Sequence, residues 1–402
     1  MANVRKGCVD VPQGEVHFRY GGSGPTVVLL HDSPRSSVVH VPNIEWLGEH
    51  FTVLALDTPG HGLSSPLPID HPTIPDYSRA LGDALTALGI ERCAIYGHHN
   101  GAKIALQFAV DAPQRAALTI VDGLSLPVQM PEEDYLRQYL QSFAPTPEGD
   151  HIVRQWCRNL DIHRYYPWFT RDAGSRVARD LPDDRELHEY ATDVFMASEH
   201  WPGAYGAALR HAALPVIAHL RSPTVIMCRQ GDLLYEHLDR LPLAMPNGCR
   251  VARVADAPGA WRSQLLAALS DRTSAVASGW QAPPAQATAS VHWRRHRYVN
   301  HLHGQVRVGL RGSATSQAPT LLLHDLPGTP RQLDGLAAEL ATDRLVVTLE
   351  LPGLGESDPL PSPTLGAYVS VIDETLEALG CENVDVVAEG LGAAFACALA
   401  AN

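Results

Sequence analysis

Features that mark whole classes of protein are missing from this 402-residue sequence. It contains no run of about 18 apolar residues, so no transmembrane helix is expected. Its seven cysteines are scattered and form no Cys-x-x-Cys pair, which favours reduced thiols over a disulfide framework or a zinc site. The start of the chain, residues 1–14, holds no apolar signal-peptide segment. Together these absences predict a cytoplasmic protein.

Positive charge is scarce as well. The chain has 31 Lys and Arg residues against 44 Asp and Glu residues, a formal net charge of −13. Phosphate groups would be repelled by such a chain, so neither nucleic acid nor an anionic membrane surface is expected as a partner. With 45% hydrophobic and 19% charged residues the composition is globular, and 402 residues are too many for one ordinary core. Two domains are therefore expected.

Short apolar runs alternate with helical patterns through the first 270 residues. These continuous, partly β-branched runs are typical of parallel strands that are buried on both faces. They are Thr26–Leu30, Phe51–Leu56, Ala94–Tyr96, Leu118–Val121, Pro223–Cys228 and Cys249–Val254. Between them lie segments with helical spacing, such as Tyr77–Leu88, which stops at Gly89. The alternation predicts an α/β protein with a doubly wound, mostly parallel sheet.

The stretch Ala94–Ala109 is the most informative part of the chain. An apolar run meets Gly97-His98-His99-Asn100-Gly101, and a helix-like run follows. This is the layout of a nucleophile elbow, a sharp turn from strand to helix that presents one side chain at its tip. Glycines flank the tip because a Cβ there would clash. The usual pattern is Gly-x-Ser-x-Gly, whereas the residue at the tip here is His99.

Three motifs in order give the chain its resemblance to a known family. They are Leu29-Leu30-His31-Asp32, then Asp57-Thr58-Pro59-Gly60-His61-Gly62-Leu63-Ser64, then the turn at His99. Over about residues 10–272 the sequence resembles the α/β-hydrolase family. The resemblance implies a first domain over residues 1–272 with an inserted helical cap at about 123–215, which would wall off an apolar pocket and exclude water.

The resemblance also implies where the catalytic residues would stand. Asp232 follows a strand at the position of the family's triad acid, but the loop Ala255–Trp261, where the family carries its catalytic histidine, contains none. A serine triad needs a nucleophile, a base and an acid, and this chain offers only the acid. The ordinary serine mechanism is therefore not expected.

What remains is an imidazole at a pre-formed turn, which can act as general base, general acid or nucleophile. We predict that His99 is the catalytic base and that Asp232 or Asp122 orients it. The backbone at Asn100 and the loop Asp32-Ser33, beside His31, would form an oxyanion hole. The expected reaction is hydrolysis, or related acid–base chemistry, of a small apolar ester, lactone or carbonyl compound. The alternative is an inactive pseudohydrolase that binds a ligand or serves as a scaffold.

A metal site at these strand ends is the weaker interpretation. Four candidate ligands, His31, Asp32, His98 and His99, stand near one another in the predicted fold. Adjacent side chains diverge, however, so His98 is expected to point away from His99, and no ligand motif such as His-Glu-x-x-His is present. We predict no metal and no cofactor, and a small molecule as the partner.

A second copy of the motifs follows a stretch rich in Ala, Pro, Ser and Thr, residues 273–290, which is typical of a linker. Leu321–Asp325 mirrors Val28–Asp32, and Glu350 follows His324 by 26 residues, as Asp57 follows His31. The second elbow has Gly390 at its tip, which excludes a nucleophile there. Residues 291–402 are thus predicted to be a truncated second hydrolase-like unit. Its last strand would be a sheet edge covered by domain one, by another chain in an oligomer, or by further sequence.

Overall fold

The computed structural model describes residues 3–177, 180–197, 200–270, 279–281 and 291–401. The chain divides into two compact units. The first comprises residues 1–4 and 9–280, and the second comprises residues 5–8 and 281–402.

The first unit is built on an eight-stranded sheet with the order β1-β2-β4-β3-β5-β6-β7-β8. β2 runs antiparallel to β4, and the strands from β4 to β8 are parallel to their neighbours. The strands are β1 (Arg5–Val11), β2 (Gly14–Gly21), β3 (Thr26–Leu30), β4 (Thr52–Leu56), β5 (Cys93–His98), β6 (Ala116–Asp122), β7 (Thr224–Arg229) and β8 (Cys249–Val254). The mostly parallel sheet agrees with the alternation in the sequence.

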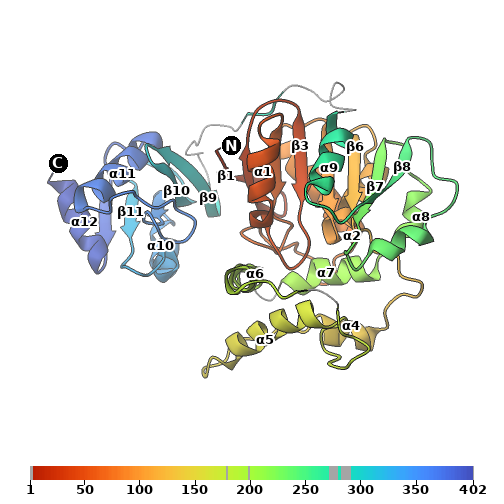
Figure 1. Cartoon of the computed structure of the whole chain (residues 1–402). Coiled ribbons are helices and arrows are strands. Elements are labelled where there is room, and N and C mark those ends of the chain that lie inside the picture. The colour runs from red at the N-terminus through yellow and green to blue at the C-terminus, as the bar shows by residue number, and fades with distance from the viewer. Residues whose placement is uncertain (1–2, 178–179, 198–199, 271–278, 282–290, 402) are drawn as a thin grey trace. The chain divides into compact units, whose positions relative to one another are not determined.

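Helices bury both faces of this sheet, because alternate residues of a strand point to opposite sides. Val28 and Leu30 of β3 pack with α2 (Ile74–Ala87) and α3 (Asn100–Asp111). Val27 and Leu29 pack on the other face with α1 (Val41–Leu47) and α9 (Ala260–Ser270), the pair of helices nearer the viewer in Figure 1.

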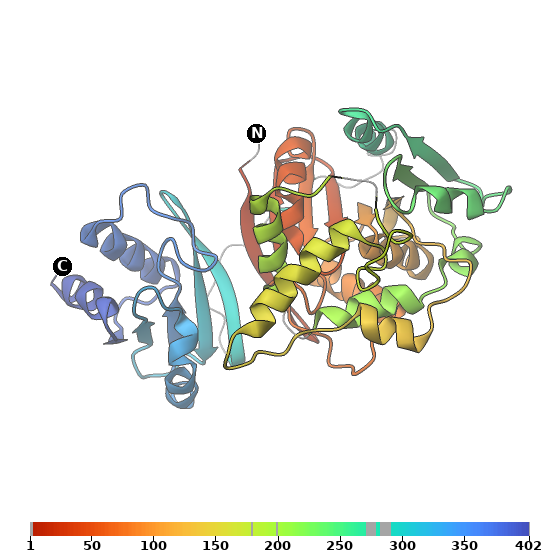
Figure 2. The same ribbon diagram turned by 60° about the horizontal axis from the view of Figure 1, so that its bottom comes forward.

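A set of helices is inserted between β6 and β7, where the resemblance implied a cap. They are α4 (Glu133–Tyr139), α5 (Asp150–Arg164), α6 (Asp184–Ala197), α7 (Trp201–Arg210) and α8 (Ala213–Ile217). Helices α4 to α7 gather on one side of the sheet (Figure 1 and Figure 2). We refer to α4 to α7 and the loops between them as the cap.

Two buried polar contacts tie the cap to the sheet. Asp193 of α6 receives a hydrogen bond from Ser36 Oγ at 2.7 Å and pairs with Arg35 Nε at 2.7 Å. Lys103 of α3 donates from Nζ to the carbonyl oxygens of Ala208, at 2.7 Å, and His211, at 2.9 Å. Burial lowers the pKa of Lys103 to about 8. These contacts fix α6 and the end of α7 relative to the loops that carry the site.

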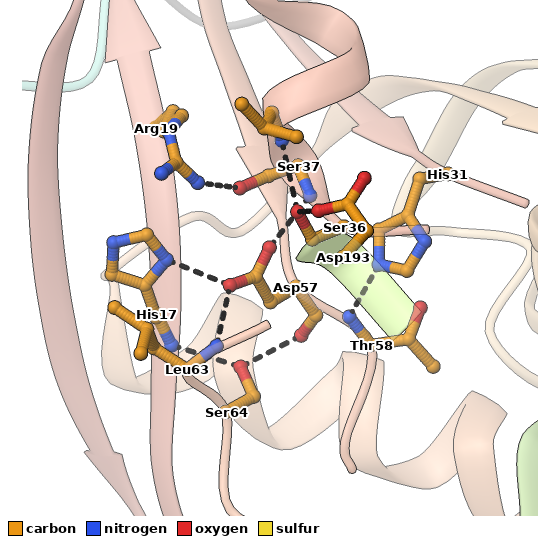
Figure 3. A network of polar contacts seen from close by, with 11 residues as sticks. His17, Arg19, His31, Ser36, Ser37, Asp57, Thr58, Leu63, Ser64 and Asp193 are labelled. Carbon is orange, nitrogen blue, oxygen red and sulfur yellow. Dashed lines mark hydrogen bonds and ion pairs between the residues drawn. The ribbon is translucent and has the colours of Figure 1, made fainter. Parts of the chain in front are cut away.

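The Asp57 carboxylate is the centre of a buried polar network beneath these loops (Figure 3). Its Oδ2 lies 2.8 Å from His17 Nδ1 and accepts from the Leu63 N–H at 3.0 Å, and its Oδ1 accepts from the Ser37 N–H at 2.6 Å. Although burial alone would raise the pKa of Asp57, His17 and Arg19 hold it well below its usual range. The network joins β2, the end of β4 and the loop after β3.

The second unit contains a five-stranded sheet with the order β9-β10-β12-β11-β13, which is the order of β1-β2-β4-β3-β5. β10 runs antiparallel to β9 and β12, and β11 is parallel to β12 and β13. Its elements are β9 (Val291–His301), β10 (Gly304–Gly312), β11 (Thr320–Leu323), α10 (Asp334–Leu340), β12 (Val346–Leu349), α11 (Leu365–Ala378), β13 (Asp385–Ala388) and α12 (Leu391–Ala400).

Hydrogen bonds at matching positions extend this likeness. Glu350 Oε1 pairs with Arg307 Nη1 at 2.7 Å, and its Oε2 accepts from the Glu356 N–H at 2.9 Å, much as Asp57 does in the first unit. β13 lies at the end of the strand order, with Val386 and Val387 exposed. What covers this edge stays a prediction.

Of the predicted linker, 273–290, only residues 279–281 belong to the described part of the chain. Within it Trp280 packs edge-on against the rings of Phe18 and Tyr20, with centroids 5.7 Å and 5.3 Å away, and donates from Nε1 to the Leu88 carbonyl at 2.7 Å. This partly buried tryptophan packs against the core of the first unit. Among the described helices, none has the length and apolar character needed to cross a bilayer.

Substituting Asp57 tests the polar network. Asp57→Ala leaves three donors buried without an acceptor, so we expect the free energy of unfolding to fall by about 3–5 kcal/mol. Asp57→Asn keeps one acceptor oxygen and should cost less. Urea unfolding at pH 7 measures both, with Asp70→Ala at an exposed position as the control. Equal stability of Asp57→Ala and the control would contradict the role of the network.

Two other buried histidines predict how stability depends on pH. Burial lowers the pKa of His40 and of His61 to about 3, from an ordinary value of 6.5. Between those values the unfolded chain binds protons that the folded chain does not, so stability falls as the pH drops below 6.5. Each histidine should add a slope of up to about 1.4 kcal/mol per pH unit. Urea unfolding from pH 7.5 to 4.5 should therefore give a shallower slope for His61→Asn than for the unsubstituted chain. Identical slopes would refute this.

Candidate functional site

The turn between β5 and α3 holds His99 in a strained conformation. Its φ is 47° and its ψ is −104°, and no other non-glycine residue in the described ranges has a positive φ. The flanking glycines are required, since a Cβ on Gly97 would lie 2.2 Å from the Gly101 carbonyl oxygen and one on Gly101 would lie 2.4 Å from that of Leu30. A side chain held at such a cost is a candidate for function.

The structure brings His99 together with Asp232, which follows β7. His99 Nε2 lies 3.0 Å from Asp232 Oδ2, and the Leu234 N–H donates to the other carboxylate oxygen at 2.8 Å. Burial opposes ionisation of Asp232, but its contacts with His98 and His99 and the Leu234 N–H hold its pKa well below the usual range. Asp232 is therefore a fixed anion beside the imidazole of His99.

His98 does not point away from His99, as the sequence led us to expect. The two rings are stacked, with centroids 3.9 Å apart and an angle of 20° between their planes. His98 Nε2 lies 3.9 Å from the same Asp232 oxygen. Burial would lower the pKa of His98, but the negative charges of Asp232, Asp122 and Asp32 raise it above its ordinary value. The turn lets adjacent side chains lie parallel because the chain direction changes between them.

The structure does not join Asp122 to the His99 imidazole. The Asp122 carboxylate is buried, and its Oδ2 accepts from the Tyr96 hydroxyl at 2.8 Å and from Trp261 Nε1 at 2.7 Å. Only its backbone reaches the turn, where its carbonyl accepts from the His99 N–H at 3.0 Å. Asp122 therefore holds Trp261 in the first turn of α9, and the prediction that it orients His99 is corrected.

His31 also has a different place from the one predicted. Its Nδ1 donates to the Asp32 carbonyl at 2.7 Å, and its Nε2 accepts from the Thr58 N–H at 2.9 Å (Figure 3). Both ring nitrogens are thus occupied by the backbone, and His31 joins two loops instead of facing a ligand.

Asp32, the next residue, lies at the site. One of its carboxylate oxygens and a nitrogen from each of His98 and His99 lie within 4.8 Å of one another. Burial opposes ionisation of Asp32, yet both histidines and Arg35 lower its pKa. Such a group could approach a metal ion. In this structure, however, both Nε2 atoms face the same Asp232 oxygen, at 3.0 Å for His99 and 3.9 Å for His98.

Asn100 and Ser33 complete the set of predicted site residues. Both are buried. The Asn100 side-chain Nδ2 has no hydrogen-bond partner within the described ranges. A buried amide donor beside His99 that lacks an acceptor is available to a ligand oxygen.

Gly123 lies against the His99 ring, a contact that we did not predict from the sequence. Its φ is 65°, and a Cβ built on it would lie 2.4 Å from His99 Cδ2 and 2.8 Å from His99 Nε2. The absence of a side chain at this position leaves the space in which the His99 ring reaches Asp232. Its position directly after β6 was the only signal in the sequence.

The corresponding turn of the second unit is closed. Gly390 has φ 54° and ψ −128°, similar to His99, but Asp325 lies where a side chain would project. Asp325 Oδ1 accepts from the Leu391 N–H at 2.7 Å and from the Leu326 N–H at 2.9 Å. Two backbone donors at this kind of turn therefore do bind an anion, and here it is the unit's own carboxylate.

A cleft of about 860 Å³ lies between the loop after β4 and helix α7. Tyr77, His200, Pro202, Arg210 and His211 are among the residues that line it, and His99, Asp32 and Asp232 are not. This cleft is therefore not the pocket that we predicted over His99.

Comparisons with known proteins agree with this architecture. Residues 25–155 match the family model described as alpha/beta hydrolase fold. The chain is 38% identical over 109 residues to an uncharacterised protein of Mycobacterium tuberculosis, a match that covers 27% of this chain and 30% of that protein. It is 27% identical over 230 residues to a putative carbamate hydrolase, RutD, of Serratia proteamaculans, covering 56% of this chain and 80% of that one.

Among solved structures, a laboratory-evolved variant of potato epoxide hydrolase superposes with a TM-score of 0.53 at 17% identity. The match covers 67% of this chain and 98% of the other. At such identity the likeness concerns the fold alone. The strand order, the family match and this superposition together establish that the chain contains an α/β-hydrolase fold with a mostly parallel eight-stranded sheet.

Proposed function

We propose that the first unit is a hydrolase-type enzyme in which His99 replaces the usual serine and works as a general base. The observation that carries this proposal is the 3.0 Å contact between His99 Nε2 and Asp232 Oδ2 at a strained turn. An ionised carboxylate that accepts from one ring nitrogen leaves the other nitrogen as a proton acceptor. This is the division of labour between the acid and the base of a triad.

The reaction would begin with a water molecule beside His99 Nδ1. His99 takes a proton from that water as its oxygen attacks the carbonyl carbon of an ester or lactone, and the positive charge on the ring is stabilised by Asp232. The oxyanion that forms would accept from backbone N–H groups at Asn100 and Ser33 and from the free Asn100 Nδ2. His99 then returns the proton to the leaving oxygen. The Asp325 contacts in the second unit support anion binding at such a turn.

The substrate class follows from the cap and from the relatives. The cap is rich in aromatic side chains, which suits a small apolar ester, lactone or carbonyl compound. The relatives include a putative carbamate hydrolase, and a carbamate, like an ester, has a carbonyl carbon that water can attack. We further propose that the protein is cytoplasmic, needs no metal or cofactor, and has no nucleic-acid or membrane partner.

We propose that the second unit, residues 291–402, is a partial copy of the same fold and has no catalytic activity. Its strand order and its Glu350 contacts support the copy, and the Asp325 carboxylate in the turn at Gly390 supports the loss of a site. The first domain would then span 1–272, with the cap at about 123–215.

The second candidate function is a ligand-binding pseudohydrolase. The observation that favours it is Trp261 at the start of α9. It ends the stretch 255–261, where the family resemblance places a histidine, and it donates a hydrogen bond to Asp122. In this case His99 and Asp232 would be a satisfied pair in a site without turnover.

Substituting His99 decides between the two. A panel of aryl esters and lactones should be hydrolysed by the unsubstituted chain and about 10²–10⁴-fold more slowly by His99→Ala. Asp232→Asn should lower kcat less, and His188→Ala, at an exposed position of the cap, should leave it unchanged. Unaltered activity in His99→Ala, or inhibition by a serine-directed phosphonate, would contradict the His99 mechanism. Binding without turnover would favour the pseudohydrolase.

Gly123 offers a second test with a matched control. Gly123→Ala places a methyl group against the His99 ring and should displace it from Asp232, lowering kcat about as much as Asp232→Asn does. Gly149→Ala carries a similar backbone strain, with φ 75° against 65°, but its Cβ meets nothing within 4 Å. Steady-state kinetics of the two variants should therefore diverge although both lose some stability. Equal kcat values would show that the His99 ring position does not matter.

A further inference from the structure

Within the described ranges, Arg158 is a buried cation without a hydrogen-bond acceptor. It lies on α5 of the cap, and its residue is only 1% exposed. Its Nε, Nη1 and Nη2 atoms are all buried, and none has a hydrogen-bond partner in the part of the chain that the structure describes. A guanidinium group carries five N–H donors and stays charged in proteins, so this is the most expensive kind of unpaired group to bury.

Aromatic rings surround this guanidinium group. Its central carbon lies 4.5 Å from the ring centroid of Trp201 and 5.2 Å from that of Trp168. Trp168 is itself held in place, because its Nε1 donates to the Tyr139 carbonyl at 3.1 Å. The ring faces attract the positive charge, but they do not supply oxygen acceptors for the N–H groups. The aromatic contacts therefore place Arg158 without satisfying it.

Two carboxylates of the described part of the cap are paired with other arginines. Asp161, one turn along α5, pairs with Arg171 at 2.7 Å, and Asp193 of α6 pairs with Arg35 at 2.7 Å. Asn159, the neighbour of Arg158, has an unpaired buried Nδ2, while its oxygen accepts from Gln155 at 2.8 Å. Among the described residues, the unpaired groups on this turn of α5 are thus donors, and no acceptor in these ranges is paired with them.

We propose that Arg158 binds the carboxylate of a small organic ligand whose apolar body lies among the aromatic side chains of the cap. A carboxylate supplies two oxygens in the geometry that a guanidinium group binds with two parallel hydrogen bonds. It also brings a single negative charge, which one arginine balances, whereas a phosphate group brings about −1.5 to −2. The inference rests on the proposed function in taking this ligand to be the substrate or product of the His99 site.

Arg158 lies on the cap helix that is farthest from the sheet. In Figures 1 and 2, α5 is on the outer side of the cap, with α6 and α7 between it and the sheet. Tyr190 of α6 is buried there, with the Arg35 guanidinium 5.1 Å from its ring centroid. Burial raises the pKa of the Tyr190 hydroxyl to about 12, and charges on both Arg158 and Asp32 act on it. The charges of Arg158 and of Asp32 thus both act on the hydroxyl of one buried tyrosine.

Binding of simple carboxylates tests this without any need for turnover. The probes are butyrate, benzoate and phenylacetate, each paired with its neutral amide, and the readouts are the rise in Tm and the Kd from titration calorimetry. Arg158→Met keeps an apolar side chain between the two tryptophans but removes the charge. The control is Arg154→Met, one turn earlier on α5, where the arginine is exposed and stacks on Phe143 at 4.5 Å.

We expect at least one carboxylate to raise the Tm of the unsubstituted chain and of Arg154→Met, and its amide not to do so. Arg158→Met should bind that carboxylate at least about tenfold more weakly, or about 1.4 kcal/mol. Without ligand, Arg158→Met should be as stable as the unsubstituted chain or more so, because an unpaired buried charge is removed. Arg158→Lys keeps the charge and should retain part of the binding.

Two results would overturn the proposal. One is the absence of carboxylate-specific binding to the unsubstituted chain across the panel. The other is a large loss of stability in ligand-free Arg158→Met with carboxylate affinity unchanged, which is the signature of a purely structural arginine. Failure of the His99 mechanism would look different, since His99→Ala would then keep full activity while carboxylate binding still depended on Arg158.

Discussion

The buried Asp57 carboxylate is the interaction on which the rest of the first unit depends. It holds His17 of β2, the backbone of Leu63 after β4, and Ser37 in the loop after β3. The same loop carries Ser36, which binds Asp193 of the cap. A single ionised group therefore connects the sheet to the loops at the site and, through them, to α6. Because it is fully buried, every donor that it holds would otherwise be left unsatisfied.

The turn at His99 shows how strain and chemistry are combined at this edge of the sheet. Gly97 and Gly101 allow the backbone to pass close to its neighbours, and Gly123 leaves room for the His99 ring to meet Asp232. The second unit has a similar turn, but a carboxylate occupies it in place of an imidazole. With Gly390 at the tip, Asp325 occupies the space and the backbone donors. One backbone geometry thus serves either to present an imidazole or to close a site.

Buried charge is unbalanced at two places in the first unit, at the His99 turn and at Arg158 in the cap. Around His99, two carboxylates face two stacked imidazoles, and the surplus negative charge raises the pKa of His98. Around Arg158, the charge is positive, and its N–H groups have no acceptor among the residues that the structure describes. In our proposals, a ligand would meet Arg158 with its carboxylate and the His99 turn with its polarised carbonyl group.

The sequence by itself determined the parallel strands of the first unit and the turn at His99, because these depend on local patterns of apolar residues and glycines. It also pointed to Asp232, whose position after a strand places it at the same sheet edge as His99. Only the tertiary structure decided which side chains meet there. His31 is taken up by two loop backbones, Asp122 is bound to Trp261, and His98 stacks on His99. Arg158 could be recognised as a candidate only from the structure, in which it is buried and has no hydrogen-bond partner among the described residues. Such contacts join residues far apart in the chain, and their partners are set by packing and not by spacing.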